Sequence, residues 1–148
     1  MCIRDRFDLR VRFYELDPYG HVNHATYLQY FEAARVKWLA DMDQGLNELR
    51  DENVQLVVTT VATRFVAPAF LGDELVIDTA LVNAKRVQAQ WAQHARRDGE
   101  LIACQRINFA TVNSTGRPIR IPESLMEAME HFQAGPADLA KELPDLKL

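Results

Sequence analysis

The sequence predicts an α+β fold in which a five-stranded antiparallel sheet wraps around one long central helix. One strand-like segment comes first, a long helical segment follows, and four strand-like segments and a short helix complete the chain. Strands and helices do not alternate and no glycine-rich phosphate loop is present, so a doubly wound parallel sheet is disfavoured. A chain of 148 residues is expected to form one domain with a substantial core.

The first strand is expected over residues 7–13, where apolar and charged residues alternate as in a half-buried strand. The apolar members of this alternation are Phe7, Leu9, Val11 and Phe13. Residues 1–6 are charged and do not join the alternation, so they are expected to be a non-native or disordered start. The single domain is then expected over residues 7–132, with residues 133–148 as a C-terminal tail.

The long helix is expected from about His24 to Met42. Asn23 precedes it as a suitable N-cap, and no Gly or Pro interrupts the next nineteen residues. The apolar face at helical spacing consists of Tyr27, Leu28, Phe31, Ala34, Trp38, Leu39 and Met42. Few residues on the opposite face are strongly polar, so the helix is expected to be largely enclosed.

Arg35 falls within this apolar face of the helix. A buried guanidinium needs a partner, and Glu32, three residues earlier, is the local candidate. We expect an ion pair that fixes the helix against the sheet, and a direct role of Arg35 in chemistry is the less favoured alternative.

The remaining strands are expected over residues 54–65, 74–83, 86–97 and 101–112. A short helical turn is expected over residues 46–50, and Pro122 opens a helix over residues 123–132. Asp98-Gly99 is a strong signal for a two-residue hairpin between the last two strands.

Composition excludes several classes of protein. The net charge of −4 argues against a nucleic-acid binder, and no apolar run reaches the length of a membrane span. No charged-then-apolar leader is present, so the expected location is the cytoplasm. Cys2 and Cys104 are too few for a disulfide framework, and Cys104 is expected to be a small buried hydrophobe.

The chemistry is expected at the loop between the first strand and the long helix. Pro18 and Gly20 mark a tight turn there, and the helix begins a few residues later. Asp17 therefore lies beside unpaired backbone N–H groups at a helix N-terminus. The carboxylate can act as a base or nucleophile while the N–H groups hold a developing oxyanion. A turn-forming aspartate before a proline is the alternative.

The same stretch carries the pattern Tyr14-x-x-Asp17-x-x-Gly20-His21-Val22-Asn23-x-Ala25-x-Tyr27, followed by Glu32 and Arg35 on an aromatic-rich helix. This pattern resembles the hotdog-fold acyl-CoA thioesterases of the 4-hydroxybenzoyl-CoA thioesterase family. The bacterial long-chain acyl-CoA thioesterases are most similar, because their loop also carries His-Val-Asn. The resemblance implies a hotdog fold and hydrolysis of acyl-CoA to free acid and CoA, in lipid metabolism.

The resemblance also implies roles for individual residues. Asp17 would be the base or nucleophile, and the backbone N–H of His24 would hold the oxyanion, with the N–H of Asn23 or Ala25 as alternatives. His21 is a secondary catalytic candidate and more simply a hydrogen-bonding scaffold. Asn23 and Tyr27 are substrate-binding candidates, although an N-cap and a core residue are the simpler interpretations. No cluster has metal-ligand spacing, so neither metal nor cofactor is expected.

The phosphates of CoA call for basic side chains near strand ends. Arg64 and Arg86 are the substrate-binding candidates among the basic residues Arg64, Lys85, Arg86, Arg96, Arg97, Arg117 and Arg120. Plant acyl-carrier-protein thioesterases have a related loop with Asn two residues after the Asp, where this chain has Tyr19. An acyl-carrier-protein thioesterase and a non-catalytic acyl-thioester-binding module stay as alternatives, and Asp17 argues against the latter.

A homodimer or a tetramer of paired dimers is expected. One sheet around one helix leaves edge strands to cover, and the late strands, including Trp91, are expected to leave apolar surface. The resembling family pairs two sheets edge to edge and places the active site between subunits. The expected partners are therefore acyl-CoA and a second copy of the chain, with no nucleic acid and no membrane.

Overall fold

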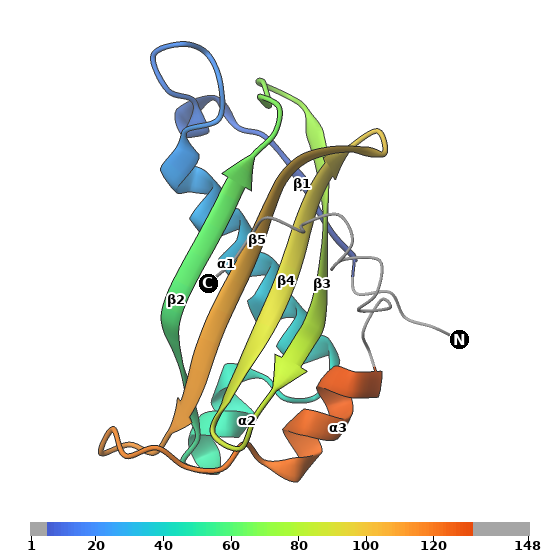
Figure 1. Cartoon of the computed structure of the whole chain (residues 1–148). Coiled ribbons are helices and arrows are strands. Elements are labelled where there is room, and N and C mark those ends of the chain that lie inside the picture. The colour runs from blue at the N-terminus through green and yellow to red at the C-terminus, as the bar shows by residue number, and fades with distance from the viewer. Residues whose placement is uncertain (1–5, 132–148) are drawn as a thin grey trace.

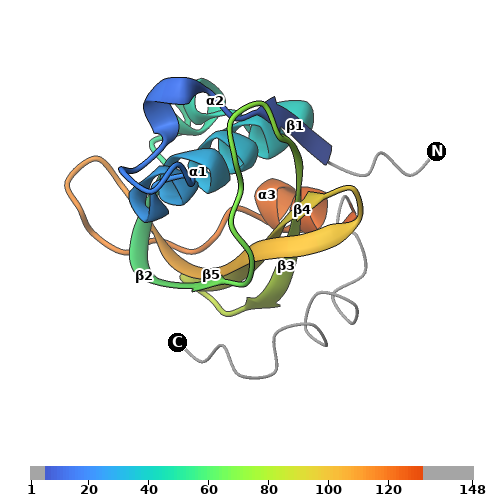
Figure 2. The same cartoon turned by 90° about the horizontal axis from the view of Figure 1, so that it is seen from above.

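The computed structural model describes residues 6–131, which form a five-stranded antiparallel sheet curved around one long helix (Figures 1 and 2). The strands lie in the order β1-β3-β4-β5-β2. They are β1 (Arg6–Arg10), β2 (Gln55–Phe65), β3 (Glu74–Ala84), β4 (Gln88–Arg97) and β5 (Glu100–Val112). The helices are η1 (Phe13–Glu15), α1 (His24–Asp41), α2 (Leu46–Asp51) and α3 (Glu123–His131). The expected architecture is confirmed. Arg6 was expected to belong to a start outside the domain, but it is the first residue of β1 and pairs with Asp78. Residues 1–5 and the expected tail lie outside the described residues.

The first strand is shorter than expected. β1 ends at Arg10, and Phe13 is 75% exposed in a 3₁₀ turn instead of lying on a buried strand face. The cause is local hydrogen bonding: the Glu15 N–H donates to the Arg12 carbonyl at 3.0 Å, and the Arg12 N–H donates to the Glu15 carboxylate at 2.7 Å. These groups close a turn and so do not continue the ladder with β3.

The helix α1 lies in the concave side of the sheet, as the view from above shows (Figure 2). Its buried residues are Tyr27, Tyr30, Phe31, Ala34, Trp38 and Leu39. Leu28 and Val36 are exposed, so the expectation that the helix is largely enclosed is wrong for the described part of the chain. The sheet covers one side of α1 and leaves its outer side open.

Arg35 does not rely on Glu32 as expected. Its Nη1 donates to Gln93 Oε1 at 2.8 Å on β4 and to Gln105 Oε1 at 3.0 Å on β5. Burial lowers the pKa of Arg35 to about 10, partly opposed by the charge of Glu32. Two neutral amides from central strands therefore hold the guanidinium, and the local sequence offers no sign of them. The predicted fixing of helix against sheet is present, with other partners.

The buried apolar residues form two main clusters, and the one at the far end of α1 contains both tryptophans. The Trp38 and Trp91 rings meet edge to face at 5.4 Å between centroids, and the Trp91 Nε1–H donates to Met129 Sδ at 3.2 Å. Trp91 is only 3% exposed, so it leaves no apolar surface to cover, contrary to expectation. The helix α3, which brings Met129, closes this end of the sheet (Figure 1). Cys104 is fully buried, as predicted.

No helix among residues 6–131 has the length and apolar character needed to cross a bilayer.

Candidate active site

The loop before α1 is a closed turn organised by Asp17. Leu16 and Val22 form an antiparallel bridge, and the Asp17 N–H donates to the His21 carbonyl at 2.7 Å. The Asp17 Oδ1 accepts the N–H groups of Tyr19 at 2.9 Å and His21 at 3.2 Å. Within the described residues Oδ2 accepts no hydrogen bond. The turn-forming role and a chemical role are therefore compatible, because each uses a different oxygen.

The N-terminus of α1 leaves one particular donor unpaired. The Asn23 side chain caps the helix by accepting the Ala25 N–H at 2.9 Å, and the Asn23 N–H donates to the Glu15 carbonyl at 2.9 Å. The His24 N–H makes no hydrogen bond to any residue in the range 6–131. Of the three N–H groups considered from the sequence, only that of His24 is available to a ligand.

Asp17 and His24 line the same cavity, which has a volume of about 270 Å³. The cavity wall consists of Asp17, His21, Val22, His24, Tyr27, Phe65, Val66, Ala67 and Pro68. The Tyr27 ring is buried and meets Phe65 at 5.4 Å between centroids, and burial raises the pKa of the Tyr27 phenol. The wall is therefore apolar opposite the carboxylate. Asn23 is absent from this lining, because its side chain is engaged as the N-cap.

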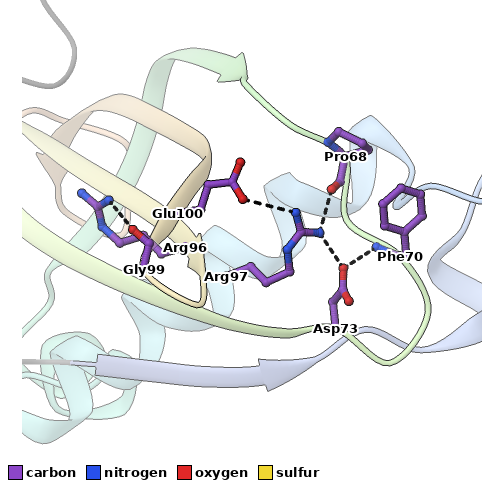
Figure 3. A network of polar contacts seen from close by, with 7 residues as sticks. All are labelled: Pro68, Phe70, Asp73, Arg96, Arg97, Gly99 and Glu100. Carbon is purple, nitrogen blue, oxygen red and sulfur yellow. Dashed lines mark hydrogen bonds and ion pairs between the residues drawn. The ribbon is translucent and has the colours of Figure 1, made fainter.

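The segment between β2 and β3 supplies the opposite wall, and an ion pair holds it in place (Figure 3). Arg97 Nη1 donates to Asp73 Oδ2 at 2.7 Å and to the Pro68 carbonyl at 3.0 Å. The Phe70 N–H donates to the same Asp73 oxygen at 2.8 Å. Next to it, the Ala69 carbonyl accepts the Val22 N–H at 2.9 Å, so this clamp links the wall to the loop of Asp17.

The clamp shifts the titration of both of its charged members. Burial alone would raise the pKa of Asp73, but hydrogen bonds from Phe70 and Arg97 and the charge of Arg97 hold it below its usual value. The hydrogen bond to Asp73 raises the pKa of Arg97. Asp73 was missed from the sequence, where it is one more polar residue in a turn. Its partner Arg97 is 24 residues away, so only the fold joins them.

The two expected arginines do not reach this cavity. Arg64 pairs in register with Cys104 on β5, and its neighbour Phe65 faces α1, so Arg64 lies on the sheet face away from α1. Arg86 lies in the β3–β4 turn at the opposite end of the subunit (Figure 1). There it lines a groove of about 980 Å³ together with Lys85 and Arg120.

A carboxylate with a free oxygen and an unpaired N–H in one cavity suit the hydrolysis of an activated acyl group. The carboxylate can activate water or attack the carbonyl carbon, and the N–H can hold the developing oxyanion. Among residues 6–131, no three His, Cys, Asp or Glu side chains gather as a metal site would require.

Comparisons with known proteins identify related thioesterases. The family model described as "Thioesterase-like superfamily" matches residues 11–129. Long-chain acyl-CoA thioesterase FadM of Escherichia coli (strain K12) is 30% identical over 127 residues, covering 84% of this chain and 96% of FadM. Acyl-acyl carrier protein thioesterase ATL3, chloroplastic, of Arabidopsis thaliana is 27% identical over 127 residues, covering 84% of this chain and 67% of ATL3.

The fold is shared with a solved thioesterase. The crystal structure of a thioesterase from Thermus thermophilus, complexed with coenzyme A and Zn, has a TM-score of 0.78 and 28% identity. The match covers 92% of this chain and 99% of that one. The resemblance that rested on the loop and helix pattern is confirmed: this chain belongs to the thioesterase-like superfamily, has the hotdog fold and is a thioester hydrolase.

Proposed function

We propose that this protein hydrolyses acyl-CoA thioesters to free acid and CoA, with Asp17 as base or nucleophile and the His24 N–H as oxyanion donor. The observation that carries the proposal is that the Asp17 carboxylate, free at Oδ2, and the unpaired His24 N–H line one cavity of about 270 Å³. FadM, similar along most of its length, is named a long-chain acyl-CoA thioesterase, which supports the CoA half of the substrate.

Two routes satisfy the same geometry. Asp17 accepts a proton from water as the water oxygen attacks the thioester carbon, or the carboxylate attacks that carbon to give a mixed anhydride that water then opens. In both routes the carbonyl oxygen becomes negative beside the His24 N–H, and the C–S bond breaks to release the CoA thiolate. One such donor typically contributes about 3 kcal/mol of transition-state stabilisation.

An acyl-carrier-protein thioesterase is the second candidate, and the similarity to ATL3 favours it. Tyr19 stands where the plant enzymes were expected to carry Asn, which argues against their catalytic arrangement here. A screen of purified protein against acyl-CoA of increasing chain length, aromatic acyl-CoA and acyl-carrier-protein thioesters separates the two, read as release of free thiol. Turnover on carrier-protein thioesters alone would overturn the CoA assignment.

The proposal includes a homodimer formed along the edge of β2. Within residues 6–131, β2 pairs only with β5, so its other edge is open. Three exposed valines lie on this strand: Val57, Val58 and Val61. An open, apolar edge strand is a natural site for pairing with another strand. A second copy pairing antiparallel along β2 would make one continuous sheet, and two such dimers would make the expected tetramer.

Such a dimer also suggests where the CoA phosphates bind. A two-fold axis beside β2 sets the far end of one chain next to the Asp17 end of its partner. The groove of Lys85, Arg86 and Arg120 then lies near the partner's cavity and offers three cations to phosphates. Arg86→Ala should raise KM for acyl-CoA and leave hydrolysis of a short pantetheine thioester unchanged, and an equal effect on both would exclude the groove. The cytoplasmic location stays a prediction.

A further inference from the structure

Glu15 joins three segments around the candidate active site. Its carboxylate Oε1 accepts the Arg12 N–H at 2.7 Å and the Tyr30 hydroxyl at 2.9 Å. Its backbone carbonyl accepts the Asn23 N–H at 2.9 Å. One residue therefore ties together the turn after β1, the cap of α1 and the body of α1.

The hydrogen bond from the Tyr30 hydroxyl to Glu15 is strong. Tyr30 is 6% exposed and lies within α1, nearly two turns beyond His24. Burial, followed by the hydrogen bond to Glu15 and the charge of Glu15, raises the pKa of Tyr30 well above its usual value, so the phenol stays protonated and donates. A hydrogen bond to a charged acceptor is stronger than one between neutral groups.

The positions of both proposed catalytic groups, the Asp17 carboxylate and the His24 N–H, depend on these hydrogen bonds of Glu15. Asp17 follows Glu15 by two residues, and the bond to the Glu15 carbonyl occupies the N–H immediately before that of His24. Because Tyr30 sits on the helix whose N-terminus presents the His24 N–H, the Tyr30–Glu15 bond sets the loop of Asp17 against that N-terminus. Reaction rates fall steeply when reacting groups are misplaced by about 1 Å.

We propose that Glu15 and Tyr30 are positioning residues for thioester hydrolysis, which hold the Asp17 carboxylate and the His24 N–H at the correct separation. This inference rests on the proposed function. Neither side chain lines the cavity, so their effect passes through the groups they hold.

The test must separate positioning from a general loss of stability, and Thr111 offers a matched control. Its buried hydroxyl donates to the Ile119 carbonyl at 2.6 Å. Thr111 is the penultimate residue of β5, and this strand ends at the end of the subunit opposite the loop before α1 (Figure 1). Thr111→Val and Tyr30→Phe each remove one buried hydroxyl without changing the shape much. Both should lower Tm by similar amounts, and only Tyr30→Phe should lower kcat, by roughly tenfold, with KM nearly unchanged.

Two Glu15 variants complete the kinetic arm. Glu15→Gln keeps an acceptor oxygen and should retain most of kcat. In Glu15→Ala, kcat should fall to a similar extent as in Tyr30→Phe. The rates are measured well below Tm. Unchanged kcat in Tyr30→Phe, or an equal loss in Thr111→Val, would overturn the proposal.

Hydrogen exchange gives a readout that needs no turnover. Amides of residues 12–24 should exchange faster in Tyr30→Phe and Glu15→Ala than in wild type or Thr111→Val. Unchanged exchange in this segment would show that Glu15 and Tyr30 do not hold the loop in place. Asp17→Asn is assayed in parallel: if it keeps the wild-type rate, the proposed catalytic assignment fails, and the exchange data still decide whether Glu15 and Tyr30 hold the loop.

Discussion

Asp17 and His21 are joined by a reciprocal pair of hydrogen bonds that uses only the backbone of His21. The His21 carbonyl accepts the Asp17 N–H at 2.7 Å, and the His21 N–H donates to Asp17 Oδ1 at 3.2 Å. The imidazole instead packs edge-on against Phe70, with 5.3 Å between ring centroids. We therefore predict that His21→Phe, which keeps a ring at this position, retains kcat within a few-fold. Steady-state kinetics check this, and a loss as large as that of Asp17→Asn would make the imidazole catalytic.

Replacement of Asp17 by Asn should abolish most turnover while the fold persists. The Asn side chain keeps an oxygen that can accept the Tyr19 and His21 N–H groups, so the turn should survive. It cannot accept a proton or attack a carbonyl, and the expected loss is roughly a hundredfold or more. Circular dichroism and Tm provide the control for folding. A purified variant that hydrolyses acyl-CoA at nearly the wild-type rate would refute the assignment.

The backbone N–H of His24 can be removed almost selectively. Proline is well accepted at the first position of a helix, and Asn23 already has the extended ψ of 135° that a following proline requires. His24→Pro should therefore keep the fold and lower kcat by roughly a hundredfold, whereas His24→Ala should keep most activity. The test is a comparison of kcat for the two variants, and an equal loss of kcat in both would count against a backbone oxyanion donor.

Stability should depend on pH through Asp73. Its folded pKa is held below the usual 3.8, so the carboxylate contributes stability that is present above that value and lost as pH falls through the folded pKa. Asp73→Asn should lower the free energy of unfolding by about 1 kcal/mol at pH 7, since the Asp73 and Arg97 side chains are only 25% and 21% exposed. Urea unfolding at pH 7, 5 and 3 checks this, and the gap between wild type and variant should shrink only below pH 4. A gap independent of pH would contradict it.

The β2 edge provides a prediction about assembly. Val61 is exposed on β2, and a lysine there should oppose strand pairing. Val61→Lys should shift the particle towards a monomer in light scattering, with activity lost in parallel. A wild-type protein that is monomeric and fully active at nanomolar concentration would overturn the dimer. Mixed dimers refine the test, because each proposed site combines Asp17 of one chain with Arg86 of the other. With Asp17→Asn in one chain and Arg86→Ala in the other, one of the two sites should keep both residues and the other should lose both.

The loop and helix start were predictable because their interactions are local. Asp17 accepts N–H groups from two and four residues later, and Asn23 caps an N–H two residues later. Turn chemistry and helix capping depend on such neighbours, so the order of residues is enough to anticipate them. The boundaries of β2 to β5 were predicted to within two residues for the same reason, because side-chain alternation is a local property, whereas β1 ends earlier than its alternation suggested.

What only the tertiary structure decided are the contacts between residues distant along the chain. Arg35 lies 58 and 70 residues from Gln93 and Gln105, and the sequence suggested Glu32 because it is near on the same helix. In the same way Asp73 finds Arg97 across a strand pair, and Tyr30 reaches back fifteen residues to Glu15. Local pattern determines where a helix begins and which face is apolar. The curvature of the sheet and the packing of α1 within it determine which buried polar groups lie close together. Each buried polar group needs a hydrogen-bond partner, and the fold determines which partner is within reach.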